Sequence, residues 1–273
     1  MDSGVFKRGK LLESMPRAAI DGAIRDGRLR ALRHGWLATP TADPDVVRAV
    51  SIGGVLSCAS ALTLHGVWVP PTSKLHVRGS TASVRNHPTW CRQHGRPPTV
   101  TDAVDDLPTA LRHAARCLPT EDFVVVCDSI LNRGLLTPSA LAAELGGTPQ
   151  SVQHALSLVD GRSESGTETM VRLRLRRPNL QIRTQVPIPC VGRVDLVIGT
   201  SLIIEVDGYE YHADPDQFEK DRLRDLQAWA LGYHPIRLTY RQVVYQWNLV
   251  GPLIDEAIKR GLHRKPLVAA GFA

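Results

Sequence analysis

The chain has 273 residues, of which 43% are hydrophobic, and it carries a formal net charge of +6. This length and composition fit globular folding in two domains, or in one domain with appendages, and the positive charge favours an anionic partner. Five cysteines without a CxxC pair argue against a disulfide framework and a zinc finger, and fit a reducing cytoplasm. No apolar stretch approaches the about 18 residues of a membrane span, and residues 1–17 lack the apolar run of a signal peptide. We therefore expect a cytoplasmic protein without a membrane partner.

The first 40 residues predict two short helices, over 5–13 and 16–26, followed by a small β-wing. Pro16 suits the first turn of the second helix, and an apolar stripe predicts its buried side: Ala19, Ile20, Ala23 and Ile24. Arg17 and Arg25 lie opposite this stripe, where a recognition helix faces a groove. Eight basic residues stand here against four acidic ones, an asymmetry expected of a phosphate-binding module.

The segment resembles the N-terminal winged-helix domain of AbiEi-type abortive-infection antitoxins, with Arg28-Leu-Arg30 and Arg33-His-Gly35-Trp36 in its wing. DNA contacts are then expected from five arginines: Arg17, Arg25, Arg28, Arg30 and Arg33. Winged helices also serve as protein interaction modules, which is the alternative.

Residues 41–160 are nearly neutral and predict an α/β connector without a catalytic constellation. Helices are expected over 43–66 and 107–118 and after two Thr-Pro pairs at 137 and 148, and strands over 74–78 and 89–93. The run 123–127 fits a helix or a strand. The histidines lack ligand spacing and are expected at the surface or in loops: His65, His76, His87 and His94.

The strongest functional signal is the segment 192–208, which predicts a β-hairpin turning at 199–201. Alternating apolar residues pair Ile198 with Leu202, Leu196 with Ile204 and Val194 with Val206. The same register places Asp195 opposite Glu205, with Asp207 further along that face. Carboxylates this close repel unless a cation lies between them or one is protonated, and hard oxygen ligands suit Mg²⁺ or Mn²⁺. A solvated polar face is the alternative.

A helix is predicted upstream, from Thr167 to a stop at Pro178. Glu168 shares one helical stripe with Val171 and Leu175, so a helix laid against the hairpin brings Glu168 to the acidic pair. A first-turn glutamate favoured by the helix dipole is the alternative. Downstream we expect a helix over 216–231, a strand over 233–239 and a last helix over 250–260.

In order and spacing these residues resemble the PD-(D/E)XK nuclease superfamily, and within it the uncharacterised bacterial domain related to very-short-patch-repair (Vsr) endonucleases. The matching motifs are Ser163-Glu-Ser165, Glu168, Arg193-Val-Asp195, Glu205-Val-Asp207-Gly208, His212, Asp221-Arg-Leu-Arg224-Asp225 and Leu231-Gly-Tyr233. The resemblance covers about 161–260 and implies a restriction-endonuclease-like mixed sheet flanked by helices.

One position departs from the superfamily pattern, because Asp207 stands where a lysine usually orients or activates the attacking water. In the repair-endonuclease subgroup a histidine occupies this position, and a second histidine aligns with His212. The missing cation is expected from His212, Lys220 or Arg224, or from a second metal held by Asp207.

The resemblance implies metal-assisted hydrolysis of DNA phosphodiesters. Mg²⁺ or Mn²⁺ is expected between Asp195, Glu205 and the backbone carbonyl of Val206, with Glu168 binding directly, through water or at a second metal. His212 is expected to act as general acid or base, or alternatively to cap the turn after the strand. The expected catalytic residues are Glu168, Asp195, Glu205, Asp207 and His212, and further DNA contacts are expected from Arg172 and Arg224.

We thus expect an α/β (α+β) multidomain protein with a winged helix-turn-helix over 1–40, an α/β connector over 41–160 and a nuclease domain over 161–273. Its expected function is that of a metal-dependent DNA endonuclease, targeted by the winged helix, in phage defence or DNA repair. The alternative is a non-enzymatic DNA-binding regulator or antitoxin with a degenerate nuclease domain. Cleavage of both strands would require a homodimer or two successive nicks.

Overall fold

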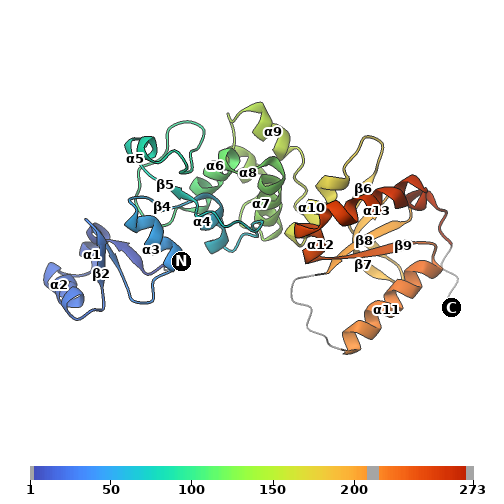
Figure 1. Cartoon of the computed structure of the whole chain (residues 1–273), viewed down its shortest axis with the longest axis horizontal. Helices are drawn as coiled ribbons and strands as arrows, with labels where there is room; N and C mark the ends of the chain where they lie inside the picture. The colour runs from blue at the N-terminus through green and yellow to red at the C-terminus, as the bar shows by residue number, and fades with distance from the viewer. Residues whose placement is uncertain (1–2, 208–214, 269–273) are drawn as a thin grey trace. The chain divides into compact units, whose positions relative to one another are not determined.

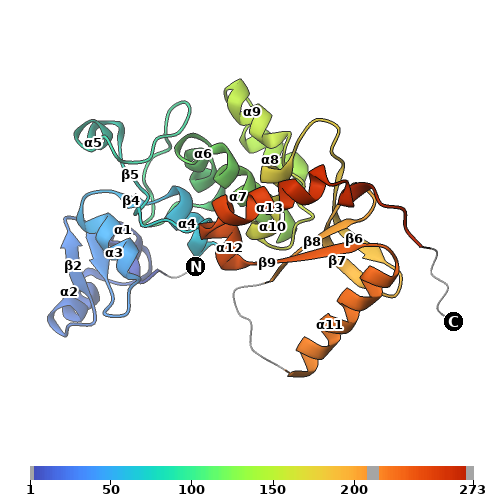
Figure 2. The same cartoon turned by 45° about the vertical axis from the view of Figure 1, so that its right-hand side comes forward.

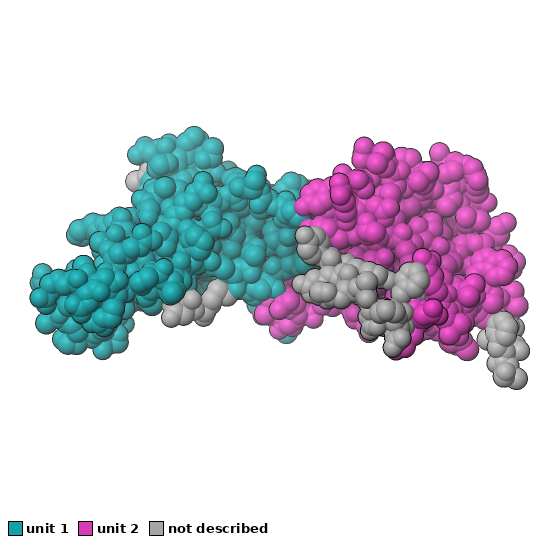
Figure 3. Space-filling model, turned by 60° about the horizontal axis from the view of Figure 1, so that its bottom comes forward, with its two compact units in different colours: residues 1–123, 136–157 teal, residues 124–135, 158–273 magenta. Residues whose placement is uncertain are grey.

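The computed structural model describes residues 3–207 and 215–268, which combine helices with several small sheets (Figure 1). The chain divides into two compact units, coloured teal and magenta in Figure 3. Unit 1 comprises 1–123 and 136–157, and unit 2 comprises 124–135 and 158–273. Helix α7 (Thr120–Asn132) contributes to both units. No described helix is long and apolar enough to cross a membrane.

Unit 1 begins with a strand, two helices and a hairpin: β1 (Val5–Lys7), α1 (Arg8–Ser14), α2 (Arg17–Arg25), β2 (Arg30–Arg33) and β3 (Trp36–Ala38). Strand β3 lies between β1 and β2 in an antiparallel sheet. The two predicted helices and the hairpin are present, but Val5 is in a strand because it pairs with Ala38 and buries its side chain. Helix α2 buries Ile20 and Ala23, whereas Ala19 is exposed.

The remainder of unit 1 is mainly helical: α3 (Pro44–Ser51), β4 (Val55–Leu56), α4 (Cys58–Leu64), β5 (Val77–Arg78), α5 (Thr81–Asn86), α6 (Leu107–Cys117), α8 (Pro138–Glu144) and α9 (Gln150–Leu156). The helices expected here are confirmed, and the ambiguous run 123–127 is helical within α7. The predicted strand over 89–93 is wrong, because this segment is irregular and Cys91 N–H donates singly to the Val77 carbonyl. One hydrophobic core joins Val5 and Trp36 to Val50 and Leu56.

Unit 2 is a four-stranded mixed sheet with helices on both faces: α10 (Gly166–Leu175), β6 (Ile182–Ile188), β7 (Gly192–Ile198), β8 (Leu202–Asp207), α11 (Pro215–Ala230), β9 (His234–Thr239), α12 (Tyr240–Tyr245), α13 (Trp247–Lys259) and the 3-10 turn η1 (Leu262–Arg264). The strand order is β6-β7-β8-β9, antiparallel except for β9, which runs parallel to β8. Helix α11 lies on one side of the sheet and α13 on the other (Figures 1 and 2).

The predicted hairpin register is confirmed in two backbone pairs, Ile198 with Leu202 and Leu196 with Ile204. These four side chains are fully buried on one face of the sheet. Val197 and Ile203 are buried on the opposite face, where they share a core with Ala228 of α11. Because side chains alternate along a strand, Glu205 lies on this α11 face, where Arg224 of α11 contacts it.

Candidate functional site

Unit 2 gathers acidic and basic side chains on and beside the sheet. Asp195 stands on β7, Glu205 and Asp207 stand on β8, and Glu168 lies in the first turn of α10. The predicted His212 lies outside the described residues. The backbone pairing of β7 with β8 ends at Leu196 and Ile204. Next to this pair, Asp195 Oδ2 accepts the Val206 N–H at 2.8 Å, which holds Asp195 at the C-terminal end of β8.

Helix α10 places Glu168 inside the unit. The helix begins at Gly166, one residue before the predicted start, and its N-cap Ser165 Oγ accepts the Glu168 N–H at 3.2 Å. Glu168 is only 4% exposed, and its Oε2 accepts the Glu164 N–H at 3.0 Å. A glutamate serving the helix dipole alone would remain at the solvent side, so this burial favours a role inside the site.

Gln185 joins the two acids, and it was missed in the sequence. Its Nε2 donates to Glu168 Oε2 at 2.8 Å and to Asp195 Oδ1 at 3.3 Å. Its φ of 53° lies in the left-handed region, which costs a non-glycine residue of order 1–3 kcal/mol and occurs preferentially at functional sites. No sequence pattern marks this residue, since a glutamine within a strand is ordinary.

Two arginines pair with Glu205. Arg237 Nη2 lies 2.8 Å from Glu205 Oε2, and Arg224 Nη2 lies 3.1 Å from Oε1. Arg237 is the parallel neighbour of Glu205 on β9, and it also contacts Asp207 at 3.4 Å and Asp225 at 3.0 Å. Arg224 was among the predicted cations, but Arg237 was not. The parallel register of β9 beside β8 is the signal that would have identified it.

The other expected substitutes for the lysine do not have this position. Lys220 is exposed on α11, and His212 lies outside the described residues. Of the three expected side-chain cations, Arg224 is therefore the one that the described structure places on Glu205.

Burial raises the pKa of Glu168, Asp195 and Glu205. For Glu168 the main cause is desolvation, to which the charge of Asp195 adds. For Asp195 desolvation outweighs the Val206 hydrogen bond, and for Glu205 it outweighs the charges of Arg237 and Arg224, which lower the pKa. A carboxylate with a raised pKa is the better proton acceptor near neutral pH, which is typical of general bases.

The expectation of Mg²⁺ or Mn²⁺ is wrong. Both oxygens of Glu205 are engaged by guanidinium groups, and Asp195 Oδ2 is engaged by the Val206 N–H, so this arrangement does not fit a hard divalent ion. Among the described residues, the groups that converge as metal ligands are Cys58, His76, Cys91 and Cys117. Three thiols and an imidazole are soft and borderline donors typical of zinc, whereas Mg²⁺ requires oxygen ligands.

The thiol cluster comes from four separate parts of unit 1. Cys58 opens α4, His76 directly precedes β5, Cys91 follows α5, and Cys117 ends α6. His76 lies in a loop, as predicted, but it is buried, with only 3% of its surface exposed. The lack of a CxxC pair did not exclude such a cluster, because the fold rather than local spacing brings these residues together.

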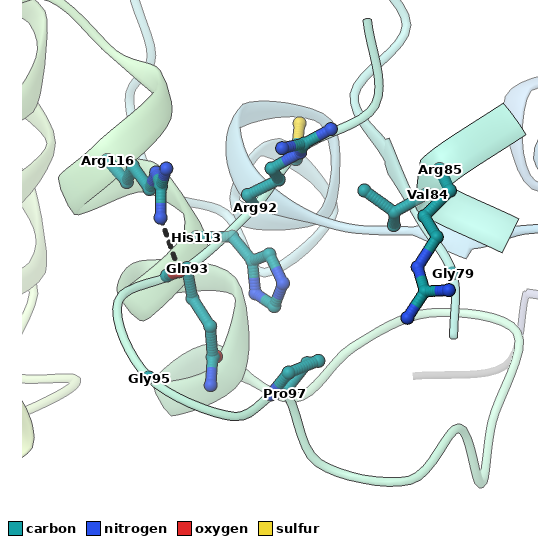
Figure 4. Close-up of a pocket in the computed structure, with 10 residues that line it drawn as sticks. Gly79, Val84, Arg85, Arg92, Gln93, Gly95, Pro97, His113 and Arg116 are labelled. Atoms are coloured by element: carbon teal, nitrogen blue, oxygen red, sulfur yellow. Dashed lines mark hydrogen bonds between the residues drawn. The ribbon is translucent and has the colours of Figure 1, made fainter. Parts of the chain in front are cut away.

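Unit 1 also contains a basic cavity of about 320 Å³ beside Cys91 (Figure 4). Its lining includes Arg85, Arg92, Gln93, His113 and Arg116. Arg116 Nη1 donates to the backbone carbonyl of Gln93 at 3.2 Å, which fixes one wall. Among the residues that the structure describes, none of those predicted for catalysis lines this cavity.

The arginines predicted to contact DNA from the N-terminal segment differ in exposure. Four are exposed: Arg17, Arg25, Arg28 and Arg30. Arg33 is half-buried, stands over the ring of Trp36 at 5.4 Å and donates to the Gly54 carbonyl at 3.2 Å. This burial lowers the pKa of the Arg33 guanidinium. Arg33 therefore supports the hairpin, and the exposed four carry the accessible charge.

Arg172 is held inside unit 2. Its Nη2 lies 2.6 Å from Asp128 Oδ2, and its Nη1 donates to the Leu158 carbonyl at 2.8 Å. Thr169 Oγ1 donates to the same Asp128 oxygen at 2.8 Å, and Asp128 is only 1% exposed. Arg172 was expected to contact DNA, but these contacts make it an anchor of α10, and hence of Glu168.

The chain was compared with protein-family models, with curated proteins and with solved structures. No match was found in any of the three comparisons.

Proposed function

We propose that this protein is an endonuclease that hydrolyses DNA phosphodiester bonds in unit 2. The observation that carries the proposal is the buried acidic pair, Glu168 and Asp195, bridged by Gln185 beside the arginines on Glu205. The resemblance of these positions to PD-(D/E)XK and Vsr-related nucleases supports it, as does a mixed sheet covered by helices on both faces, expected of a restriction-endonuclease-like domain.

The acids would accept and donate the protons that the reaction transfers. Hydrolysis forms a bond between phosphorus and the oxygen of water and breaks the bond between phosphorus and one deoxyribose oxygen. The attacking water loses a proton and the leaving oxygen gains one, which yields a phosphomonoester and a free hydroxyl. Glu168 and Asp195 have raised pKa values through burial, so either one accepts a proton from water more readily than an ordinary carboxylate.

The arginines would bind the phosphate. Guanidinium groups recognise phosphate oxygens by paired hydrogen bonds, and they stabilise the charge that develops during transfer. Arg224 and Arg237 already meet a carboxylate at Glu205, so an incoming phosphate would share these donors. We infer that Arg237, 3.4 Å from Asp207, supplies the cation that the superfamily lysine supplies elsewhere.

The N-terminal segment would bring DNA to the enzyme. Helices α1 and α2 with the β2–β3 hairpin have the element order of a winged helix-turn-helix. The exposed arginines on α2 and β2 supply charge for phosphate contacts, which add affinity without sequence preference.

Cleavage of supercoiled plasmid by the full chain tests the proposal, in EDTA and across a panel of divalent cations because no ion is assigned to this site. Asp195→Asn and Glu205→Gln should each lower the nicking rate at least about 100-fold. Asp255→Asn is the matched control, because Asp255 pairs with Arg177 at the surface of the same unit. Thermal unfolding of each variant establishes that it is folded. Nicking that persists undiminished in both folded site variants would refute the assignment.

A DNA-binding regulator without catalysis is the second candidate. Both oxygens of Glu205 are already engaged by arginines, as in a site that has become a structural ion-pair network. Binding of DNA in a gel-shift assay, without nicking under any of the conditions above, would favour this candidate.

A further inference from the structure

Four side chains in unit 1 direct their donor atoms at one another: Cys58, His76, Cys91 and Cys117. All four donor atoms lie within 4.8 Å of one another. Cys91 Sγ is 3.5 Å from Cys117 Sγ, and His76 Nδ1 is 3.4 Å from Cys91 Sγ and 3.6 Å from Cys117 Sγ. These four atoms form a compact, largely buried set.

These separations match the edges of a zinc coordination tetrahedron. Bonds of about 2.3 Å to sulfur and about 2.0 Å to nitrogen place two sulfurs about 3.8 Å apart and a sulfur and a nitrogen about 3.6 Å apart. A disulfide would require about 2.05 Å between Cys91 Sγ and Cys117 Sγ, which differs from the observed 3.5 Å. We propose that unit 1 binds one Zn²⁺ ion through Cys58, His76, Cys91 and Cys117.

The role of this ion is structural. Four protein ligands complete a tetrahedral shell, whereas a catalytic zinc keeps one position open for water or substrate. Three of the ligands are buried and Cys117 is half-buried. The ion would connect α4, the start of β5, the loop at residue 91 and the end of α6. Each of these segments supplies one ligand, and the four ligands are far apart in the sequence.

The surroundings hold the ligands in position. His76 N–H donates to Ser60 Oγ at 3.0 Å, and Cys91 N–H donates to the Val77 carbonyl at 2.7 Å. Cys58 has a φ of 49°, a conformation that a non-glycine residue keeps only where its surroundings enforce it.

The charge of the proposed centre is also balanced. Three thiolates and one Zn²⁺ leave a net charge of one negative unit, because a bound thiol is deprotonated. Lys74 Nζ lies 3.9 Å from Cys117 Sγ and brings one positive charge. This ammonium group would offset the excess charge at the exposed side of the cluster.

Metal analysis of the full chain tests the proposal. One zinc per chain is expected after purification without chelator. Replacement by Co²⁺ should give the visible bands of a tetrahedral site and the near-ultraviolet band of thiolate ligands. Outer contacts of metal ligands are worth about 10–100-fold in affinity, so loss of a direct ligand in Cys91→Ser or Cys117→Ser should cost more than about 100-fold. Cys190→Ser is the control, because Cys190 is an exposed free thiol in unit 2.

A serine variant can fail to fold, so the unmodified chain provides a second measurement. Alkylation of Cys117 should slow when zinc is added and accelerate when a chelator removes it, whereas alkylation of Cys190 should not respond. A folded, fully reduced chain that takes up neither zinc nor cobalt would overturn the proposal. A Cys91–Cys117 disulfide that persists in the presence of zinc under reducing conditions would overturn it as well. These outcomes are independent of DNA cleavage.

Discussion

The two clusters of polar side chains differ in how their donor atoms are satisfied. In unit 1 the thiols and the imidazole face one another. In unit 2 the acids face guanidinium, amide and backbone N–H groups. Donors that face one another favour one shared ion that remains in place, whereas acids that already have partners favour a ligand that exchanges with those partners. We therefore propose a structural role for the cluster in unit 1 and a catalytic role for the acids in unit 2.

The clusters share one backbone property. Cys58 in unit 1 and Gln185 in unit 2 both have a left-handed φ, at 49° and 53°. Neither residue is a glycine, so each conformation costs of order 1–3 kcal/mol that the surrounding contacts must offset. In both units a residue of the cluster itself has this conformation, which Asn179 and Cys190 in unit 2 also adopt outside the cluster.

The largest effect is expected from the buried ion pair of unit 1. Arg78 and Asp105 are 3% and 6% exposed, with donor–acceptor distances of 2.5 and 2.6 Å. Asp105→Ala leaves the guanidinium without its partner, so the free energy of unfolding should fall by about 3–5 kcal/mol in urea titrations. Asp102→Ala is the control, because its exposed pair with Lys10 contributes less than about 1 kcal/mol. If the two variants lost equal free energy of unfolding, the buried ion pair would contribute no more to the stability of unit 1 than the exposed one.

A smaller effect of opposite sign is expected at Glu168 in unit 2. Because the Glu168 pKa is raised in the folded state, that state binds more protons than the unfolded chain, and stability falls as the pH rises through the ordinary and then the raised pKa range. Glu168→Gln retains an oxygen acceptor for Gln185 and removes the charge. Above this pH range the variant should be more stable than the natural chain, and below it the two stabilities should converge. The nicking rate of the variant should fall.

Urea unfolding of both chains from about pH 4 to pH 8 measures this difference, since the ordinary glutamate pKa is about 4.3. If the free energies of unfolding of the two chains changed in parallel with pH, the charged form of Glu168 would not destabilise the folded state. That result would weaken the proposal that unit 2 is catalytic.

The smallest effect is expected at Lys74. Lys74→Met removes the ammonium group near Cys117, so zinc affinity should fall by a factor of a few, which corresponds to less than about 1 kcal/mol for an exposed charge. The difference should shrink at high salt, because ions screen exposed charges. Competition titrations with a zinc chelator at two ionic strengths measure it. An affinity that is unchanged at low salt would show that Lys74 does not balance the centre.

The sequence predicted the parts of the fold that depend on local pattern. Strict alternation in β7 and β8 fixed the register through Leu196 and Ile204, and the Thr-Pro pairs marked the starts of α8 and α9. The predicted pairing of Asp195 with Glu205 lies beyond the last backbone pair of β7 with β8, Leu196 with Ile204. The N-terminal strand was missed because only its pairing with β3 distinguishes it from the helix that follows.

The missed residues depend on neighbours that are distant in the chain. Arg237 meets Glu205 through parallel pairing of β9 with β8, and Gln185 reaches Glu168 through an unusual backbone angle. His76 lacks a nearby ligand in sequence, so spacing argued against a metal. Mg²⁺ was predicted because the sequence shows where the carboxylates stand. It does not show that guanidinium groups pair with both oxygens of Glu205.

The wide spread of Cys58, His76, Cys91 and Cys117 along the chain has a consequence for biogenesis. A metal-binding peptide with two cysteines in one turn captures its ion while unfolded, and the ion then nucleates folding. Here each pair of ligands that follow one another in the chain is separated by a helix or a long loop. The entropy lost on closing these loops must therefore be offset by packing of the apolar core before the ligands come together. Zinc should therefore enter a unit that is already collapsed, and metal shortage would yield a loosened chain rather than an unfolded one.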